Sequence, residues 1–174
     1  STLTINGNFY LETTPANIQV TIDGPGVFVY RVSTTITVPV PTTGGVVVDG
    51  PGVVVTLAGP TQVINGNLKI INGGKVVLAN NNQISDNGVV RIEGNSTFDI
   101  ANFTDTVAGV ELIFGSLLGT TGTLTSKASV IAENGTITAI LAGVDSTVGL
   151  VKQNPTGTVM VSTPQKLTGE LRVT

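Results

Sequence analysis

Cysteine, histidine and tryptophan are absent from this sequence of 174 residues. Without cysteine, the chain can form neither a disulfide framework nor a thiolate metal site. Without histidine, it lacks Ser-His-Asp and Cys-His chemistry, imidazole metal ligands and the commonest general base. Because these absences exclude the usual catalytic groups, we predict that the protein is not an enzyme.

Charged side chains are scarce as well, at 11% of the residues, and the formal net charge is −3. The eight lysines and arginines are scattered singly along the chain, and there are only five phenylalanines and two tyrosines. Nucleic-acid binding needs a clustered basic face, usually with aromatic side chains that stack on bases. We therefore predict no nucleic-acid partner.

Long hydrophobic runs are also missing, since the uninterrupted apolar stretches are only a few residues long. A membrane-spanning helix needs about 20 such residues, so we expect no membrane span. The chain is nevertheless 40% hydrophobic, with a mean hydropathy of +0.38, which is too apolar for a disordered chain. Its length suits a single domain over residues 1–174.

What the sequence does contain is short runs of Val, Ile and Thr between Asn-Gly and Asp-Gly pairs. β-Branched side chains fit a pleated surface, and the alternation in residues 35–38 places one set inward and the other outward. The glycine pairs favour turns with positive φ. Asn-Gly occurs at 6–7, 65–66, 72–73, 87–88 and 134–135, and Asp-Gly at 23–24 and 49–50. This pattern predicts an all-β chain.

Three pairs of related segments indicate a repeat. "IDGPGVFV" (22–29) returns as "VDGPGVVV" (48–55), a shift of 26 residues. "TINGNFYL" (4–11) is echoed by "VINGNLKI" (63–70), and "INGGKVVL" (71–78) is loosely followed by "IEGNSTFDI" (92–100). Units of about 20 to 26 residues cannot bury their own apolar face and stack as coils. An antiparallel sandwich, which also turns often, is the alternative.

We predict a right-handed parallel β-helix, with residues 64–174 as regular coils and residues 1–63 as a continuation or a cap. Pro39 and Pro41 should mark an edge or a bend, because proline cannot donate to a ladder. Gly24 and Gly50 should occupy equivalent corners of successive coils. Asn80, Asn81 and Asn82 suit a coil corner, with an ordinary solvated loop as the alternative.

From about residue 71 onward the chain resembles the passenger β-helix of bacterial autotransporter-type surface proteins, in particular the autotransporter-associated β-strand repeat. The resemblance is carried by "NNQISD", "FDIANFTDTV", "ITAILAG", "GLVK", "GTVMVS" and "GELRV" in this order. The chain departs from the family at "QNPTGT" (153–158) and "TPQKLTG" (163–169), where the family has glycine-rich and aromatic turns. The resemblance implies an extracellular or cell-surface β-solenoid of a bacterium.

Carboxylates are the remaining candidates for chemistry. A glycosidase needs two of them facing one cleft, about 5 to 10 Å apart. Asp86, Glu93 and Asp99 would approach one another if a coil turned between them, as would Asp23 and Asp49 one repeat apart. However, Asp23 and Asp49 each precede Gly-Pro-Gly, which is typical of turns, and the other three resemble charges at strand ends. We therefore expect no catalytic residue.

The sequence contains no motif for a cofactor or a metal. The glycine-rich calcium nonapeptide is missing, as is the G-x-x-x-x-G-K-[ST] phosphate loop. We predict no cofactor and no metal site.

Both ends of the sequence resemble strands of the repeat, at residues 1–11 and 166–174. Strand edges template further strands, and a head-to-tail contact propagates as a filament. We expect an extracellular structural protein whose copies stack end to end into a filament or surface matrix. One alternative is an adhesin or passenger segment that binds a surface or a glycan. Another is that these ends are cuts within a longer passenger. For most of the aromatic residues we expect core packing.

Overall fold

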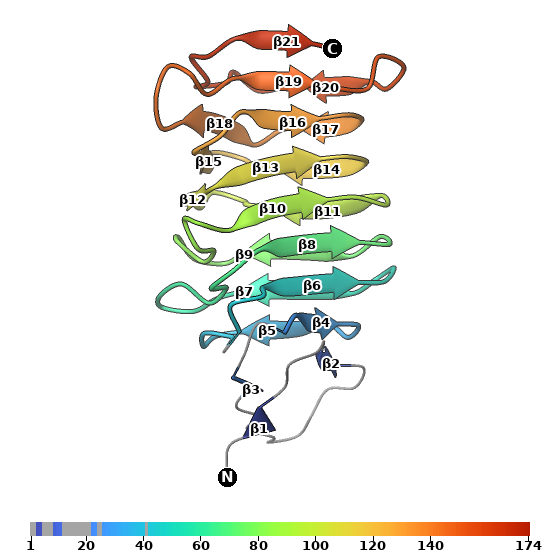
Figure 1. Ribbon diagram of the computed structural model, residues 1–174, viewed down its shortest axis with the longest axis vertical. Coiled ribbons are helices and arrows are strands. Elements are labelled where there is room, and N and C mark those ends of the chain that lie inside the picture. Colours follow the sequence, from blue (N-terminus) through green and yellow to red (C-terminus); the bar gives the residue numbers. More distant parts are fainter. Residues whose placement is uncertain (1–2, 5–8, 12–21, 24–25, 41) are drawn as a thin grey trace.

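The computed structural model describes residues 3–4, 9–11, 22–23, 26–40 and 42–174. Every regular element in these ranges is a β-strand, and every strand pairing is parallel. The strands stack as a β-solenoid of about seven turns (Figure 1). This confirms the predicted all-β class and parallel β-helix and excludes the antiparallel sandwich.

The first sheet forms one side of the solenoid and has nine strands. In stacking order they are β2 (Phe9–Leu11), β4 (Phe28–Tyr30), β6 (Val46–Asp49), β8 (Leu68–Ile71), β10 (Val89–Ile92), β13 (Gly109–Leu112), β16 (Val130–Ala132), β19 (Leu150–Lys152) and β21 (Leu171–Val173). The sheet runs without a break from β2 to β21, so β4 and β6 continue the stack of the later coils.

The second sheet has seven strands and the third sheet three. The second consists of β5 (Thr34–Ile36), β7 (Val54–Leu57), β9 (Lys75–Leu78), β11 (Ser96–Asp99), β14 (Gly115–Leu118), β17 (Gly135–Ile137) and β20 (Val159–Val161). The third consists of β12 (Asp105–Val107), β15 (Thr123–Ser126) and β18 (Ile140–Gly143). Single bridges join Val40 to Ile64 and Ile64 to Ile84. A separate pair joins β1 (Leu3–Thr4) to β3 (Ile22–Asp23).

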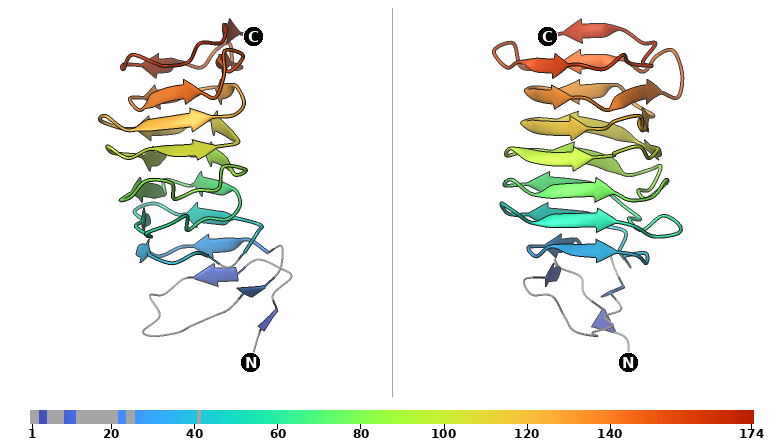
Figure 2. Two further views of the ribbon diagram at one scale, coloured as in Figure 1. Left: turned by 90° about the vertical axis from the view of Figure 1, so that its left-hand side faces the viewer. Right: turned by 180° about the vertical axis from the view of Figure 1, so that it is seen from behind.

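The winding of the chain is right-handed. With the N-terminal end down, the near strands of the first sheet run to the right and the strands of the second sheet run to the left behind them (Figure 1). The view from behind shows the same sense (Figure 2). This is the hand that right-twisted parallel strands favour in crossover connections.

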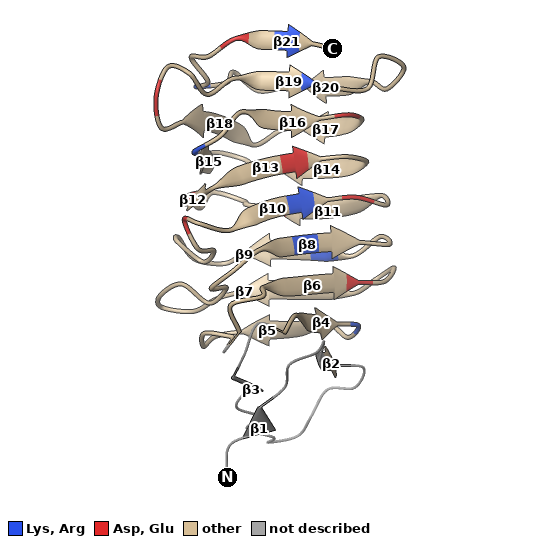
Figure 3. Ribbon diagram, viewed as in Figure 1, with Lys and Arg blue, Asp and Glu red and all other residues tan. Residues whose placement is uncertain are grey.

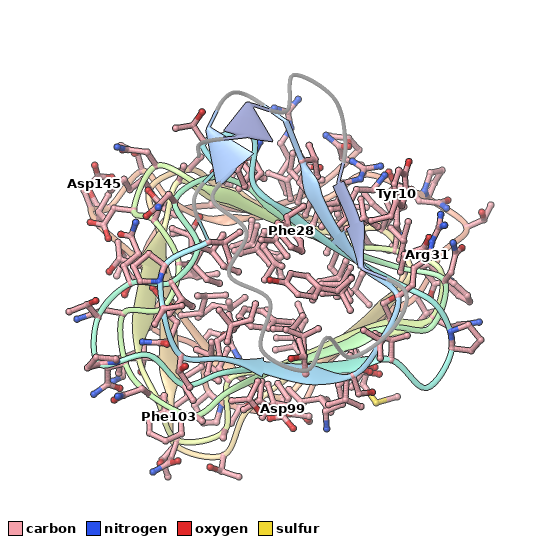
Figure 4. All side chains as sticks on the ribbon, turned by 90° about the horizontal axis from the view of Figure 1, so that it is seen from below. Tyr10, Phe28, Arg31, Asp99, Phe103 and Asp145 are labelled. Atoms are coloured by element: carbon pink, nitrogen blue, oxygen red, sulfur yellow. The ribbon has the colours of Figure 1, made fainter. Side chains whose placement is uncertain are left out.

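The core is a set of columns that run along the axis, because each inward residue stacks on the inward residue of the next coil. One column of the first sheet is Val46, Leu68, Val90, Val110 and Val130, all buried. Residues between the columns face outward, which gives the alternating burial of β6 to β11. The view along the axis shows three sides around one apolar interior (Figure 4).

The corners use glycine for two different physical reasons. At 72–73, Asn72 has φ +54° and Gly73 φ +79°, the left-handed backbone that Asn-Gly favours. At 87–88 neither residue has positive φ. There a Cβ on Gly88 would lie 2.3 Å from the carbonyl oxygen of Gly66 in the coil below. The expectation that every Asn-Gly needs positive φ is therefore wrong for this corner, where close packing of two coils excludes a side chain.

The 26-residue shift between the two similar segments is not the length of one coil. "IDGPGVFV" leads from β3 into β4 of the first sheet, whereas "VDGPGVVV" leads from β6 of the first sheet into β7 of the second. The coil spacing is 18 residues from Val29 to Val47 and 22 from Val47 to Lys69. Gly50 lies between β6 of the first sheet and β7 of the second, and Gly24 lies outside the described residues, so the predicted equivalence of the two glycines stays a prediction.

The segments of the other two similar pairs lie at equivalent positions in different coils. Phe9, Phe28, Val46 and Leu68 share one register column, as the echo of residues 4–11 in 63–70 requires. Likewise Lys75 is the register partner of Thr97. Pro39 is exposed in a corner segment, as predicted, and Pro41 lies outside the described residues.

Candidate functional site

Asp86, Glu93 and Asp99 lie at three different places around one coil. Asp86 precedes β10, Glu93 follows it and Asp99 ends β11 on the second sheet. A four-residue strand, about 3.3 Å per residue, separates Asp86 from Glu93, more than the carboxylate spacing of a glycosidase. Asp86 lies 3.6 Å from Lys127 Nζ, and Asp99 lies 3.1 Å from Lys75 Nζ. The structure does not bring the three carboxylates together.

Glu93 belongs to an ion-pair ladder on the outer face of the first sheet. It lies 2.6 Å from Lys69 Nζ and 2.9 Å from Arg91 Nε, and Arg91 Nη1 lies 2.6 Å from Glu111. Burial raises the pKa of Glu93, but Lys69 and Arg91 outweigh it and hold the pKa below its ordinary value. Figure 3 shows basic residues on β8 and β10 and an acidic residue on β13, three successive strands of the first sheet. The ladder contains two basic and two acidic side chains, so their charges balance and do not form a patch of one sign.

Asp23 and Asp49 do not occupy equivalent positions either. Asp23 lies in β3, which pairs with β1, and Asp49 ends β6 in the first sheet. The Asp49 carboxylate accepts a 2.7 Å hydrogen bond from Asn72 Nδ2 and a 2.9 Å bond from Arg31 Nε. Asn72 first, and then Arg31, hold the pKa of Asp49 below its usual value in spite of partial burial. The Asp49 carboxylate therefore stabilises a corner of the solenoid through these two hydrogen bonds.

Asn80, Asn81 and Asn82 form the predicted corner. Asn80 Nδ2 donates to the carbonyl oxygen of Gly59 at 3.0 Å, and Asn81 Oδ1 accepts from the N–H of Thr104 at 2.8 Å. Asn82 has φ +52°. These bonds reach the coils below and above, so the corner is part of the stack.

Asp105 is a buried carboxylate on the third side that sequence reasoning missed. It is 2% exposed, and its Oδ2 accepts the N–H groups of Gln83 at 2.8 Å and Ile84 at 3.0 Å in the coil below. Its Oδ1 accepts the N–H of Thr106 at 2.9 Å. Burial raises its pKa to about 6 against the effect of these three donors. The sequence signal was the alternation Asp105-Thr106-Val107, which puts Asp105 on the face of a buried valine.

Gln83 continues this polar column one coil lower. Its Oε1 accepts the N–H of Gly59 at 2.8 Å and its Nε2 donates to the oxygen of Gly59 at 3.1 Å. Gln165 repeats the arrangement, accepting from Leu141 N–H at 2.7 Å and donating to Ala139 O at 3.1 Å. Side-chain amides thus replace a backbone ladder where the third side is not a regular strand.

In the part of the chain that the structure describes, no three carboxylate, histidine or cysteine groups gather as metal ligands. The same residues include no helix long and apolar enough to span a bilayer. The remaining candidate site is therefore the C-terminal end of the stack.

The C-terminal end exposes apolar strand side chains. β21 pairs with β19 and with no other described strand. Leu171 is 71% and Val173 is 66% exposed, although the columns below them run through the inward positions of Val130 and Ala132. β20, the last strand of the second sheet, adds Met160 at 60% exposure, and Val161 is exposed too. Half of the exposed large apolar residues that the structure describes lie in these two strands.

Lys152 interrupts the apolar column just below this end. Ile70, Ile92, Leu112 and Ala132 precede it in register, and Val173 follows it. Its ammonium group donates to the carbonyl oxygen of Asn154. Sequence patterns did not predict this inward lysine, because its position depends on the register of short strands.

The opposite end of the first sheet carries aromatic residues. Phe28 and Tyr30 stack with ring centroids 4.7 Å apart, and Tyr30 is buried. The Arg31 guanidinium lies 4.7 Å from the ring centroid of Tyr10, which is 47% exposed. Seen from below, Phe28 lies in the interior, and Tyr10 and Arg31 lie together at the outer edge (Figure 4). Tyr10 and Phe114 are thus surface residues, whereas Phe28, Tyr30 and Phe98 fulfil the expected core role.

Comparison of the chain with models of protein families, with curated proteins and with solved structures gives no match.

Proposed function

We propose that the protein is a structural β-solenoid of an extracellular or cell-surface layer, and that its copies stack end to end into filaments. The observation that carries the proposal is β21, a strand with one described partner and two exposed apolar residues in inward columns. In this proposal the solenoid has the role of an autotransporter-type passenger. The sequence pieces that carry that resemblance lie at a corner, residues 81–86, and in or next to β11, β12, β18, β19, β20 and β21.

Stacking another coil on β21 satisfies two needs at once. The outer edge of a terminal strand presents N–H and C=O groups that pair readily with another strand. Full burial of a valine or leucine side chain contributes about 1.5 to 3 kcal/mol. Leu171 and Val173 are placed to gain this energy, and Val161 holds the corresponding inward position at the end of the second sheet, in register with the buried Ile137.

The second candidate is an adhesin segment that binds a surface or glycan with its side. Phe114 favours it, because this exposed aromatic residue lies in the corner between β13 and β14, away from both ends. A single exposed phenylalanine is a smaller apolar surface than the C-terminal end. Assembly is therefore the stronger proposal.

Light scattering and electron microscopy of the purified protein test the assembly. We expect filaments whose width matches one solenoid, and we expect Leu171→Lys to abolish them, because a charge replaces an apolar contact at the joint. Val144→Lys is the matched control: Val144 is another exposed apolar residue, 51% accessible, in a corner between β18 and β19.

Filaments that persist in Leu171→Lys would contradict stacking through β21. A monodisperse monomer at high concentration would contradict assembly altogether and would leave β21 as the place where further coils of a longer chain continue. Loss of filaments in both variants would mean that added charge, rather than the joint, is responsible.

A further inference from the structure

The joint between stacked copies, which rests on the assembly proposed above, is restricted by the polarity of the first sheet. All of its strands run in parallel, with β2 at one end and β21 at the other. The pairing can continue unchanged only if β21 of one copy lies parallel to β2 of the next. Such a joint is head-to-tail, and it repeats the geometry that already holds within the chain.

Side-chain alternation then selects the register. Within the sheet, inward residues meet inward residues, as Phe28 meets Val46 and Tyr30 meets Val48. In β21, Leu171 and Val173 occupy inward columns and Arg172 follows the outward column of Val151. In β2, Phe9 and Leu11 are the register partners of Phe28 and Tyr30. A slip of one residue would move Arg172 into the core column and bury an unpaired guanidinium group.

The matching register places Arg172 opposite Tyr10. Adjacent strands lie about 4.8 Å apart, and a guanidinium group is attracted to an aromatic ring within about 6 Å of its centroid. Tyr10 already receives Arg31 at 4.7 Å, and its side chain is 47% exposed. The outer face of β2 therefore suits an approaching arginine, and β21 carries one at the corresponding position.

We propose that a second copy of this chain is the partner of β21, and that β2 of that copy pairs with it in one register. Leu171 lies opposite Phe9, Arg172 opposite Tyr10 and Val173 opposite Leu11. The inward columns of the first sheet continue across the joint, and an arginine–tyrosine contact covers its outer face.

Disulfide trapping tests the register directly, because the chain has no cysteine of its own. In the double variant Tyr10→Cys and Arg172→Cys, opposite Cα atoms come within the roughly 4.4 to 6.8 Å that a disulfide spans. The strands that carry these positions, β2 and β21, lie toward opposite ends of the stack (Figure 1), so each bond joins two copies. We expect a ladder of covalent oligomers on mild oxidation, which disappears on reduction.

The matched control is Tyr10→Cys with Leu171→Cys, whose cysteines lie on opposite faces of the sheet at the joint. We expect it to give several-fold less covalent product at the same protein concentration. Both double variants must keep the far-ultraviolet circular dichroism of the unmodified protein for the comparison.

A charge exchange gives an independent measurement that needs no oxidation. Arg172→Leu should raise the concentration at which scattering begins about two- to fivefold, the size of an exposed arginine–aromatic contact. Arg172→Glu should raise it further, and adding Tyr10→Lys to Arg172→Glu should restore assembly.

The outcomes separate the register from the assembly itself. In one outcome, the unmodified protein assembles while the Tyr10→Cys/Arg172→Cys variant gives no more covalent product than the Tyr10→Cys/Leu171→Cys variant. That result would overturn the register and leave end-to-end stacking in place. If the unmodified protein does not assemble at any concentration, both are overturned. Preferential trapping of the Tyr10→Cys/Arg172→Cys variant together with rescue by Tyr10→Lys supports the joint.

Discussion

At the scale of single residues, Asp105 is the most unusual group in the core. Its register partners along the third sheet are Leu124 and Leu141, both buried. A carboxylate in this column holds the N–H groups of Gln83 and Ile84. The third sheet ends at β12, where the side chain of Asp105 takes over the pairing that a backbone carbonyl would otherwise supply.

The titration of Asp105 should make stability depend on pH. Burial raises its pKa from 3.8 to about 6, so between these values the folded protein binds more protons than the unfolded chain. The free energy of unfolding should therefore fall as pH rises from about 4 to 7, by up to about 3 kcal/mol from this group. Urea denaturation across this range measures the effect, and Asp105→Asn should flatten it.

Asp145→Asn is the control for this titration. Hydrogen bonds from Thr147 lower the pKa of Asp145 below its ordinary value, so its contribution changes only at more acidic pH. The variant should keep the slope of the unmodified protein between pH 4 and 7. A slope that survives Asp105→Asn would show that another group titrates there.

Gly88 and Gly52 should respond differently to alanine. A Cβ at Gly88 would meet the Gly66 oxygen at 2.3 Å, whereas a Cβ at Gly52, where φ is +78°, has no other atom within 4 Å. We expect Gly88→Ala to cost about 3 kcal/mol or more through overpacking of two backbones. Gly52→Ala should cost about 1 kcal/mol through backbone strain alone. Chemical denaturation measures both, and equal costs would contradict the crowding at Gly88.

At the scale of strands, the apolar alternation was predictable. Val46–Asp49 and Lys75–Leu78 alternate between buried and half-buried side chains, as their β-branched composition indicates. The third side was not predictable, because Val40, Ile64 and Ile84 contribute single bridges. Side chains such as Gln83 complete these segments through contacts between coils, which local sequence patterns do not encode.

Lys152 should lower the stability of β19 and the coils next to it. It follows Ala132 in an inward column whose earlier members are Leu112, Ile92 and Ile70. We expect Lys152→Ile to stabilise the last coils by about 1 to 2 kcal/mol, because apolar surface replaces a charged tip at an inward position. Hydrogen exchange of β19 and β20 measures this locally.

Lys127→Ile provides the comparison for this change, since Lys127 is an exposed lysine beside Asp86 at a corner. It should leave exchange in β19 and β20 unchanged. If Lys152→Ile accelerates exchange there, the bond from its ammonium group to Asn154 outweighs the apolar gain.

At the scale of the whole molecule, stability should be graded along the axis. Each coil contacts only its neighbours, so inner coils gain two interfaces and terminal coils one. Fully buried side chains occur from β6 to β18, and β8 to β14 lie in the middle of the stack, whereas no residue of β20 or β21 is buried. Hydrogen exchange should be slowest in β8 to β14 and fastest in β20 and β21. Uniform protection would indicate one cooperative unit.

The stacking of coils was predictable from the sequence, whereas the coil length was predicted only as a range of about 20 to 26 residues, which overlaps the observed spacing. "TINGNFYL" and "VINGNLKI" lie in one column because their apolar residues face the same core. The two "DGPG" segments are 26 residues apart, which differs from the spacing of the coils, because these residue types favour a turn regardless of its place in the coil. The spacing of 18 to 22 residues follows from corner lengths, which the core does not constrain.

The alignment of the interstrand hydrogen bonds with the long axis has a mechanical consequence. Tension applied between the first and last coils would load the N–H···O=C ladders along their own direction and open one coil at a time. Each released coil of 20 to 22 residues would add about 70 Å of extended chain. A rod of this construction yields in steps, lengthening many-fold before its backbone is taut. In the proposed surface layer, such a solenoid would lengthen under a pulling force and so limit the force that reaches its attachment points.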